Sequence, residues 1–400
     1  MKKNGKHYGI IFLRLLRKAA LLINIAACVW LLLCFMASIW DVGDKPSYLS
    51  LLSFSNVFAV FANIFCMAFW LFSKKKLYLL FSLISLGISY PIVKASFGFN
   101  LFNTERAENT ELGLKVMTWN VHLFDLGEWT QNKQSKNKIV EFIERQDPDI
   151  VCLQEFYFDN DNPNEPYTEI FRNMGYAYHE FGYEDQAFKR HLNISAKKGE
   201  IITVGNMIFS KFPLSNAKVY HIDSASKNYV LLGVDVALSD ERKLRLFTTH
   251  LQSVTFDDKE VALAEERTQT FSTSLDSEAK GLLKKLMMAS SKRARQANAI
   301  NAITSSSDLP VIICGDFNDM PGSYVYTKIK GSLADAFSSN GLGLGRTYRK
   351  IFPTLRIDYM LYDAQALNCR AYRSPNLSLS DHNPVIATFS LKEKNSPTSK

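Results

Sequence analysis

Apolar residues follow two different patterns along the chain. Between about residues 19 and 93 they are nearly unbroken, and after residue 115 they recur at the spacing of strands and helices. Unbroken runs of about 20 residues suit the bilayer interior, whereas periodic runs bury one face in a protein core. The pattern predicts a transmembrane module (1–103), a linker (104–114), a soluble domain (115–392) and a disordered tail (393–400).

Three segments of the N-terminal module are predicted to cross a membrane. Residues 19–40 and 49–72 carry no charge and contain 22 and 24 residues, enough for two helical spans. Residues 77–95 form a shorter third span that contains Gly87 and Pro91. A signal peptide is the alternative for the first segment, but its apolar core is long and a second span follows at once.

Basic residues predict the orientation of this module. Six Lys and Arg lie in the first 18 residues, and Lys74, Lys75 and Lys76 form the second loop. Because basic segments stay in the cytoplasm, three spans place the soluble domain outside it. The prediction is an integral protein of the inner or plasma membrane with an extracytoplasmic domain. If the third segment does not cross, the domain is cytoplasmic.

Charge and cysteine content limit the classes of function. The net charge of +8 belongs to residues 1–103, which hold 11 Lys and Arg against 2 Asp, while the rest holds 36 basic and 37 acidic residues. The soluble part therefore lacks the excess positive charge of a nonspecific nucleic-acid binder. The six cysteines show no metal-ligand spacing and are expected to be buried thiols.

The soluble domain is predicted to mix strands and helices. Alternation and short apolar runs indicate strands, and longer amphipathic runs indicate helices. The predicted strands are 116–124, 149–156, 201–210, 230–237, 244–250 and 311–315, and the predicted helices are 136–146, 166–174 and 278–303.

Side chains that offer either a hard oxygen ligand or an imidazole lie at the ends of these strands or within them. They are Asn120, Glu155, His250, Asp316, Asn318, Asp358, Asp381 and His382. Turn chemistry alone explains a single Asp or Asn at a strand end. The whole set, on one rim of packed sheets, suits a hydrated Mg²⁺ or Mn²⁺, with histidines for proton transfer or phosphate binding.

Six short motifs in order carry a family resemblance. WNV, LQE, THLQS, GDFND, RIDY and SDHNP, over about residues 115–392, resemble the DNase I-like endonuclease/exonuclease/phosphatase superfamily, here as a membrane-anchored, bacterial-type member. The resemblance implies an α+β fold, a four-layer αββα sandwich with its site at one end of the two sheets.

The resemblance also implies roles around a metal and a water molecule. Glu155 is the main ligand of Mg²⁺ or Mn²⁺, with Asn120 beside it and Asp381 in the same metal-binding group. Asp316 and Asn318 position and activate the attacking water.

Further roles concern the phosphate group. His382 is expected to contact it, backed by Asp358 and Asp381. His250 is similar to the second histidine of the DNase and sphingomyelinase branch, near the leaving group. Asn206, in GNMIFSKFP, is a candidate for substrate binding in the cleft.

Four histidines match no motif, and surface or structural roles are expected for them: His122, His179, His191 and His221. In the abasic-site branch of the superfamily a carboxylate stands two residues after the Asn, and His122 occupies that position here.

The predicted function is a membrane-anchored, divalent-metal-dependent phosphoester hydrolase, most simply a phosphodiesterase of nuclease-like or sphingomyelinase/phospholipase-like type. Its partners are a phosphodiester, either a lipid head group or nucleic acid, and the lipid bilayer, with no obligate protein partner evident. The alternatives are a catalytically silent domain that binds phosphate or lipid head groups, and a phosphomonoesterase. Intact motifs favour an enzyme, because a silent domain is expected to have lost Glu155, Asp316 or His382.

Overall fold

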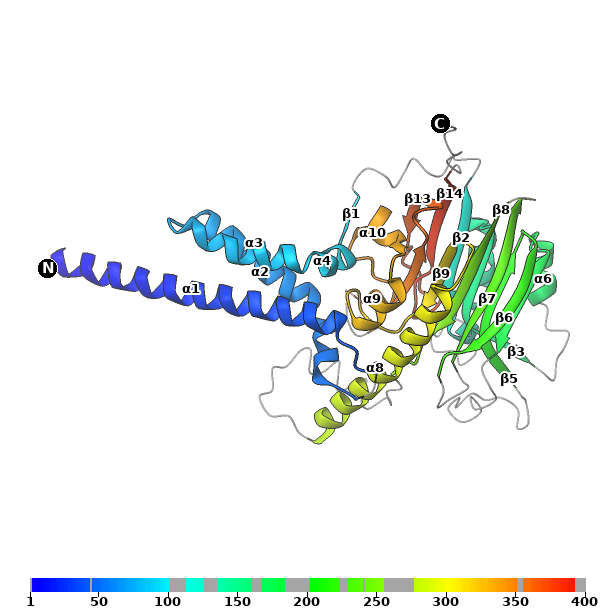
Figure 1. Cartoon of the computed structure of the whole chain (residues 1–400), viewed down its shortest axis with the longest axis horizontal. Helices are drawn as coiled ribbons and strands as arrows, with labels where there is room; N and C mark the ends of the chain where they lie inside the picture. Colours follow the sequence, from blue (N-terminus) through cyan, green and yellow to red (C-terminus); the bar gives the residue numbers. More distant parts are fainter. Residues whose placement is uncertain are drawn as a thin grey trace, which may run out of the picture.

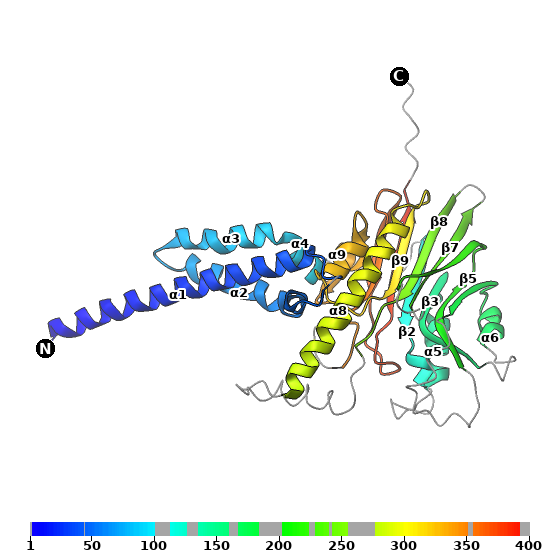
Figure 2. The same ribbon diagram turned by 60° about the horizontal axis from the view of Figure 1, so that its bottom comes forward.

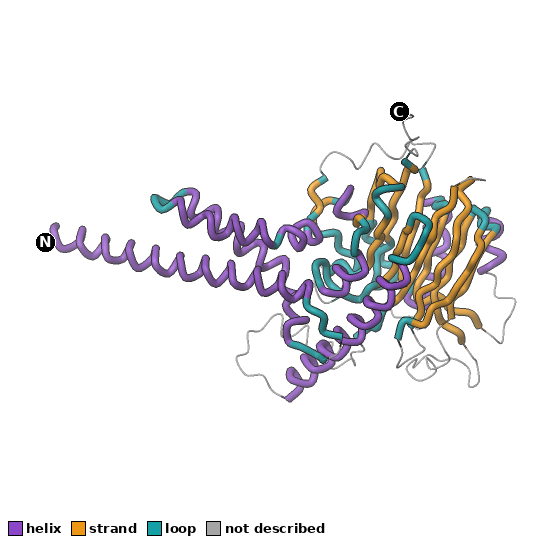
Figure 3. The backbone as a smooth tube through the Cα atoms, in the orientation of Figure 1, coloured by secondary structure: helices purple, strands orange, loops and turns teal. Residues whose placement is uncertain are grey.

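A helical arm and a domain of two packed sheets make up the molecule (Figures 1 and 3). The computed structural model describes residues 2–43, 45–100, 113–125, 135–159, 167–183, 202–223, 229–239, 242–254, 277–350 and 355–392. Nearly all of the predicted linker and the whole predicted tail lie outside these ranges.

The arm consists of helices that run back and forth between its two ends. Its elements are α1 (Lys2–Ile39), η1 (Tyr48–Ser55), α2 (Asn56–Leu71), η2 (Lys76–Tyr78), α3 (Leu79–Ile88) and α4 (Tyr90–Ser96). The N-terminus lies at the end of the arm far from the sheets, and α4 returns the chain to them (Figure 1).

Within the described residues, two helical segments are long and apolar enough to cross a membrane, Arg14–Ile39 and Tyr48–Leu71. The predicted third span is a broken helix, in which Lys76–Ile88 and Tyr90–Ser96 meet at 71°. Pro91 follows the break, and proline has no N–H with which to continue the helix. The third segment is therefore one span only if both halves are counted together.

Buried amides hold the arm helices together. The Asn63 side chain donates to the Ala27 carbonyl oxygen at 2.8 Å, and the Ser82 hydroxyl donates to Asn24 Oδ1 at 2.9 Å. Both contacts join different helices, and polar contacts of this kind stabilise helix pairs where no water competes.

In the described part of the chain, twelve strands form two six-stranded sheets. The first has the order β13-β14-β2-β3-β5-β4 and the second the order β10-β12-β9-β8-β7-β6. The strands of the first sheet are β13 (Leu367–Arg373), β14 (Val385–Leu391), β2 (Leu114–Asn120), β3 (Ile150–Asp159), β5 (Ile202–Ser210) and β4 (Tyr178–Tyr183). Those of the second are β10 (Ala334–Asp335), β12 (Asp358–Tyr362), β9 (Val311–Asp316), β8 (Arg242–His250), β7 (Val230–Ser239) and β6 (Leu214–His221).

The two sheets pack face to face, and helices cover their outer faces (Figure 2). Alternate residues such as Val116, Ile208, Leu246 and Ile312 fill the space between the sheets. Helices α5 (Ser135–Gln146) and α6 (Tyr167–Asn173) cover the first sheet, and α8 (Ser277–Thr304) and α9 (Tyr324–Lys330) cover the second. The predicted four-layer αββα sandwich is confirmed, and a short α10 (Ala336–Asn340) packs at the edge.

The prediction of a strand over residues 116–124 is wrong for the second half of that range. Strand β2 ends at Asn120, and residues His122–Asp125 form a turn (η3) whose four φ angles lie between 46° and 60°. Leu123 and Phe124 are nonetheless buried, so their apolar character comes from core packing. A strand pattern and a buried turn cannot be told apart by hydrophobicity alone.

The arm is attached to the second sheet and its helices. Strand β1 (Gly98–Phe99) pairs with β11 (Leu342–Gly343). The Asn56 side chain donates to the Pro321 carbonyl oxygen at 2.9 Å, and the Asn298 side chain donates to Asp41 Oδ2 at 2.8 Å. Helix α8 also contacts η1, so the arm adjoins the α8 side of the domain.

Candidate active site

Strand topology brings the predicted polar residues to one edge of the sandwich. Strands β2 and β3 are parallel, as are β8 and β9, so each pair ends at the same edge. His250 and Asp316 are register partners at the ends of β8 and β9. The Asn120 amide nitrogen donates to Asp316 Oδ2 at 3.1 Å and thereby joins the two sheets.

Glu155 leaves the strand ladder through an unusual backbone conformation. The pairing of β3 with β5 shifts register between Leu153 and Phe156, and Glu155 has a φ of 49°. A β-bulge of this kind re-aims a side chain. The Glu155 carboxylate consequently faces the cavity, is 20% exposed, and accepts a hydrogen bond from the Asn120 amide at 3.0 Å.

Asp316 is buried, and its ionisation is costly. Its carboxylate accepts hydrogen bonds from Asn120 and from the Asn318 backbone N–H at 2.8 Å. Burial, together with the nearby Asp358 carboxylate, raises the pKa of Asp316 to about 6, although His382 and His250 act in the opposite direction. A cation or a protonated imidazole beside Asp316 would favour its charged form.

The residue before Asp316 has to be glycine. Gly315 has a φ of 136°, and a Cβ at this position would lie 2.0 Å from the Thr249 carbonyl oxygen of β8. Only glycine permits this backbone and this close approach of the two strands. The Gly-Asp sequence therefore sets the position of Asp316 beside β8.

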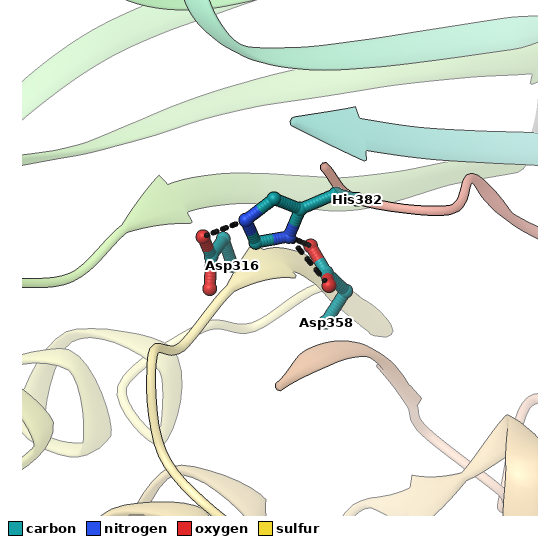
Figure 4. A group of neighbouring side chains, drawn as sticks. All are labelled: Asp316, Asp358 and His382. Atoms are coloured by element: carbon teal, nitrogen blue, oxygen red, sulfur yellow. Dashed lines mark hydrogen bonds and ion pairs between the residues drawn. The ribbon is translucent and has the colours of Figure 1, made fainter. Parts of the chain in front are cut away.

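His382 lies between two carboxylates (Figure 4). Its Nδ1 is 2.9 Å from Asp358 Oδ2, and its Nε2 is 3.6 Å from Asp316 Oδ2. Burial alone would lower the pKa of His382, but the Asp358 and Asp316 carboxylates outweigh it and raise the pKa well above its ordinary value. Figure 4 shows the two acids on opposite sides of the ring, which keeps His382 protonated and fixed in orientation.

One ring nitrogen of His250 has no hydrogen-bond partner among the described residues. Its Nε2 is buried and lies 3.8 Å from Glu155 Oε1 and 3.6 Å from Asp316 Oδ2, beyond hydrogen-bond distance. A buried polar atom without a partner is costly. The position of this nitrogen on the cavity wall leaves it available to a ligand.

His122 lines the cavity although it matches no motif, and the surface or structural role expected for it stays a prediction. Its Nδ1 is 3.3 Å from Asp381 Oδ1, and its ring lines the cavity. Lys350 lies 3.4 Å from the other oxygen of Asp381. Burial would raise the pKa of Asp381, but His382, His122 and Lys350 together lower it. The signal in the sequence was the position of His122 two residues after Asn120.

The remaining histidines and Asn206 are not part of the cavity wall among the described residues. His179 and His221 are exposed on strands, as expected, and His191 lies outside the described residues. Asn206 is buried, donates to the Val230 carbonyl oxygen at 3.2 Å, and is not among the described residues that line the cavity. Its substrate-binding role stays a prediction that the geometry does not favour.

The cavity in front of these side chains has a volume of about 530 Å³, within the range of small-molecule sites. Its polar wall consists of His122, Glu155, His250, Asp316, Asn318, Asp381 and His382, with Tyr348 against the His382 ring. Asp358 lies behind His382, where it orients the ring. The geometry thus brings all but one of the predicted residues to a single centre, either on the cavity wall or directly behind it.

The donor set suits a hard divalent cation. Glu155, Asp316 and Asp381 supply carboxylate oxygens to the cavity, and no cysteine lines it among the described residues. Asp316, Asp358 and His382 offer ligand atoms within 4.8 Å of one another. In Asn120 the amide oxygen accepts the His122 backbone N–H at 3.0 Å, so the role of Asn120 as a ligand stays a prediction.

Comparison with known proteins gives the same fold. The model of the Endonuclease/Exonuclease/phosphatase family matches residues 117–382. Human nocturnin is 23% identical over 334 residues, which cover 72% of this chain and 67% of nocturnin. The crystal structure of an endonuclease/exonuclease/phosphatase from Beutenbergia cavernae aligns with a TM-score of 0.50 and 20% identity, over 70% of this chain and 72% of that one.

The structure of the human nocturnin catalytic domain with bound sulfate aligns with a TM-score of 0.49 and 21% identity, over 71% of this chain and 95% of that one. Residues 17–96 match a separate family described as a domain of unknown function. The first family model covers well over half of the chain, spans the first five motifs and reaches His382 within the sixth, SDHNP. This chain therefore belongs to the endonuclease/exonuclease/phosphatase family of phosphoester hydrolases, as the order of the six motifs predicts.

Proposed function

We propose that the chain is a membrane-anchored, divalent-metal-dependent phosphodiesterase. One observation carries this proposal. Glu155 of β3, His250 of β8, Asp316 of β9 and His382 of the loop before β14 converge on one cavity. Hydrolysis of a phosphoester needs a base for the attacking water, donors for the phosphoryl oxygens and stabilisation of the leaving oxygen. Each requirement has a side chain in this cavity.

Asp316 accepts the proton of the attacking water. Its pKa of about 6 is high for a carboxylate and close to neutral pH, the range in which a general base works best. The Asn318 side chain donates to the Leu251 carbonyl oxygen at 2.9 Å. That contact fixes the carboxamide, so its oxygen can orient the water beside Asp316.

The two histidines serve the phosphate. His382, protonated because of Asp358, donates a hydrogen bond from Nε2 to a phosphoryl oxygen. His250 Nε2, which has no partner within the described protein, stands near the leaving oxygen. Glu155, with Asn120 and Asp381, would hold a divalent cation, which when bound would supply positive charge to offset the negative charge of the phosphoryl oxygens.

A diester fits the charge of the cavity better than a monoester. Arg293 is the one Lys or Arg among the described lining residues, and its Nε is 3.1 Å from Asp319 Oδ2. A monoester dianion would meet several carboxylates and little free positive charge. A diester carries a single negative charge, which the histidines and one divalent cation can balance.

The proposed location of the domain is extracytoplasmic. Arg17 of α1 and Ser73 of the second loop line one hollow, and the loop between α2 and α3 lies at the end of those two helices far from the sheets (Figure 1). Both basic segments therefore lie at the same end, as expected for a cytoplasmic side. If the bent third segment crosses as well, three crossings from there support a position of the sheets on the opposite side of the membrane.

The test uses the purified full chain and p-nitrophenyl methyl phosphate, a small chromogenic diester. We expect hydrolysis with Mg²⁺ or Mn²⁺, loss of hydrolysis in EDTA, and recovery when either ion is returned. His382→Asn, purified in parallel, controls for contaminating hydrolases. Full activity in the chelator, or equal activity of His382→Asn, would overturn the proposal.

A further inference from the structure

The cavity that holds the catalytic side chains has a second, apolar wall. Leu51 and Phe54 of η1 and Leu282, Leu283 and Leu286 of α8 line the cavity together with the acids and histidines. The N-terminal module thus contributes directly to the cavity. Phe54 is 36% exposed there, an apolar surface that gains from contact with another apolar group.

In the proposed membrane orientation, the η1 wall lies near the membrane boundary on the domain side. Helix α2 has 16 residues and is about 24 Å long, which falls short of the ~30 Å hydrocarbon core. At about 2.0 Å per residue, the last three residues of η1, Phe54 among them, complete the span. Exposed Trp40 and Tyr48 lie at the same end, where aromatic side chains mark the membrane interface.

The first turns of α8 extend this wall on the domain side. Figure 2 shows α8 running from the sheets toward the domain-side end of the arm helices. Leu282, Leu283 and Leu286 are half-buried toward the cavity, while Lys280 and Lys284 on the same turns are exposed. A helix with an apolar face and a basic face suits the surface of a membrane.

We infer that the substrate is a membrane phospholipid, whose phosphodiester enters the catalytic centre while an acyl chain lies against η1 and α8. The inference rests on the proposed function and names its substrate class. The phosphate remains at the polar wall, and the chain passes Leu286 and Leu51 toward the hydrocarbon boundary at Phe54. A nucleic acid is the poorer occupant, because the described lining residues include no row of cations for successive phosphates.

The experiment compares two esters that differ only in chain length, p-nitrophenyl dodecyl phosphate and p-nitrophenyl methyl phosphate. Both are given to the full chain in the same nonionic micelles with Mg²⁺, and the readout is the ratio of their kcat/KM values. We expect the ratio to exceed about tenfold in favour of the dodecyl ester, the factor that burial of two methylene groups provides. A ratio of two rates from one preparation does not depend on the fraction of active protein.

Leu51→Gln and Leu286→Gln are each expected to lower this ratio about tenfold, because each removes the burial of one leucine against the chain. Met288→Gln is the matched control: it makes a comparable change on α8, but Met288 is 46% exposed and does not line the cavity. Its ratio should equal that of the unmodified chain.

Three results would overturn the inference while the proposed function stands. These are a ratio near one in the unmodified chain, a ratio unchanged in both leucine variants, or a higher kcat/KM for the p-nitrophenyl ester of thymidine 5′-phosphate than for the dodecyl ester. The last result would point to nucleic acid. Hydrolysis of none of these esters would overturn both the proposed function and the inference that rests on it.

Discussion

Asp316 and Asp358 are register partners on the antiparallel strands β9 and β12, and their carboxylates face opposite nitrogens of one imidazole. His382 Nδ1 is 2.9 Å from Asp358, and Nε2 is 3.6 Å from Asp316. Adjacent strands thus set the spacing of the two acids, and the ring of His382 fills it. The proton on His382 depends on both acids, so each can be tested through its effect on that proton.

The first prediction concerns Asp358→Asn. Asp358 is the chief cause of the raised pKa of His382, so loss of its charge should lower that pKa. If His382 acts in its protonated form, it then loses its proton at a lower pH, and the alkaline limb of the pH profile of kcat/KM moves down. At neutral pH we expect activity to fall by roughly two orders of magnitude.

Asp363→Asn is the matched control for that measurement. Asp363 follows β12 directly and accepts a hydrogen bond from the Gln365 backbone N–H at 2.8 Å. Asp363→Asn makes the same chemical change as Asp358→Asn, but at the other end of β12. An alkaline limb that stays in place in Asp358→Asn would contradict the role given to this pair.

Much of the fold could be predicted because its strands and helices follow simple periodicity. Strand β5 at Ile202–Ser210 and helix α5 at Ser135–Gln146 differ from the predicted bounds by one residue at most. The turn after Asn120 could not be predicted, because its left-handed φ angles occur in buried apolar residues that read as a strand. The break at Ser89 is readable in retrospect from Pro91, but its angle of 71° is set by packing.

The candidate site was predictable to the extent that its residues follow strands. Asp316 and His250 come together because parallel strands end at the same edge. His122 was missed because it begins the turn after β2, and its partner Asp381 lies 259 positions away. The apolar wall was also beyond prediction, since Leu51 and Leu286 belong to elements that meet only in the tertiary structure.

The second prediction concerns the metal and Glu155→Gln. Gln keeps the size of Glu155 and its contact with Asn120 but removes the negative charge that a hard cation requires. The Mg²⁺ concentration for half-maximal activity should rise at least about tenfold, the usual scale for a change in a metal site. It is measured by titration of Mg²⁺ at fixed substrate.

Glu144→Gln, on the exposed face of α5, should leave the Mg²⁺ titration unchanged. An equal Mg²⁺ requirement in Glu155→Gln and the unmodified chain would remove Glu155 from the metal site.

The third prediction concerns the side of the membrane. Ala217 on the edge strand β6 is exposed, and so is Lys75 in the second loop of the arm. In intact cells, a membrane-impermeant maleimide should label Ala217→Cys but not Lys75→Cys. After the membrane is permeabilised, both should react. Labelling of neither cysteine in intact cells would show that the bent third segment does not cross and that the domain is cytoplasmic.

The last prediction contrasts the two acids of the Gly-Asp-Phe-Asn-Asp turn. Asp316 has a raised pKa of about 6, against an ordinary value of 3.8. In the folded state its charge is disfavoured, so its contribution to stability is most favourable below pH 3.8 and is lost as the pH rises through about 6. Asp316→Asn should therefore melt no lower than the unmodified chain at pH 7.5, and any gain should disappear toward pH 4.

Asp319 behaves differently because its carboxylate is paired. It is 3.1 Å from Arg293 Nε, and both side chains are almost fully buried. Asp319→Asn leaves a buried guanidinium without its counter-charge, a change that typically costs about 3–5 kcal/mol. The melting temperature should fall on the order of 10 °C, whereas Asp316→Asn should instead lose roughly two orders of magnitude in turnover.

Both variants are measured on the same preparations, by tryptophan fluorescence on heating and by steady-state hydrolysis of p-nitrophenyl methyl phosphate. Trp119, buried beside the site with its indole N–H on the His382 carbonyl oxygen at 2.9 Å, reports the folding of this region. If Asp316→Asn melts as early as Asp319→Asn, Asp316 is a structural residue of the turn. If it keeps both its stability and its rate, Asp316 is not the base, and the proton of the attacking water goes to another group in the cavity.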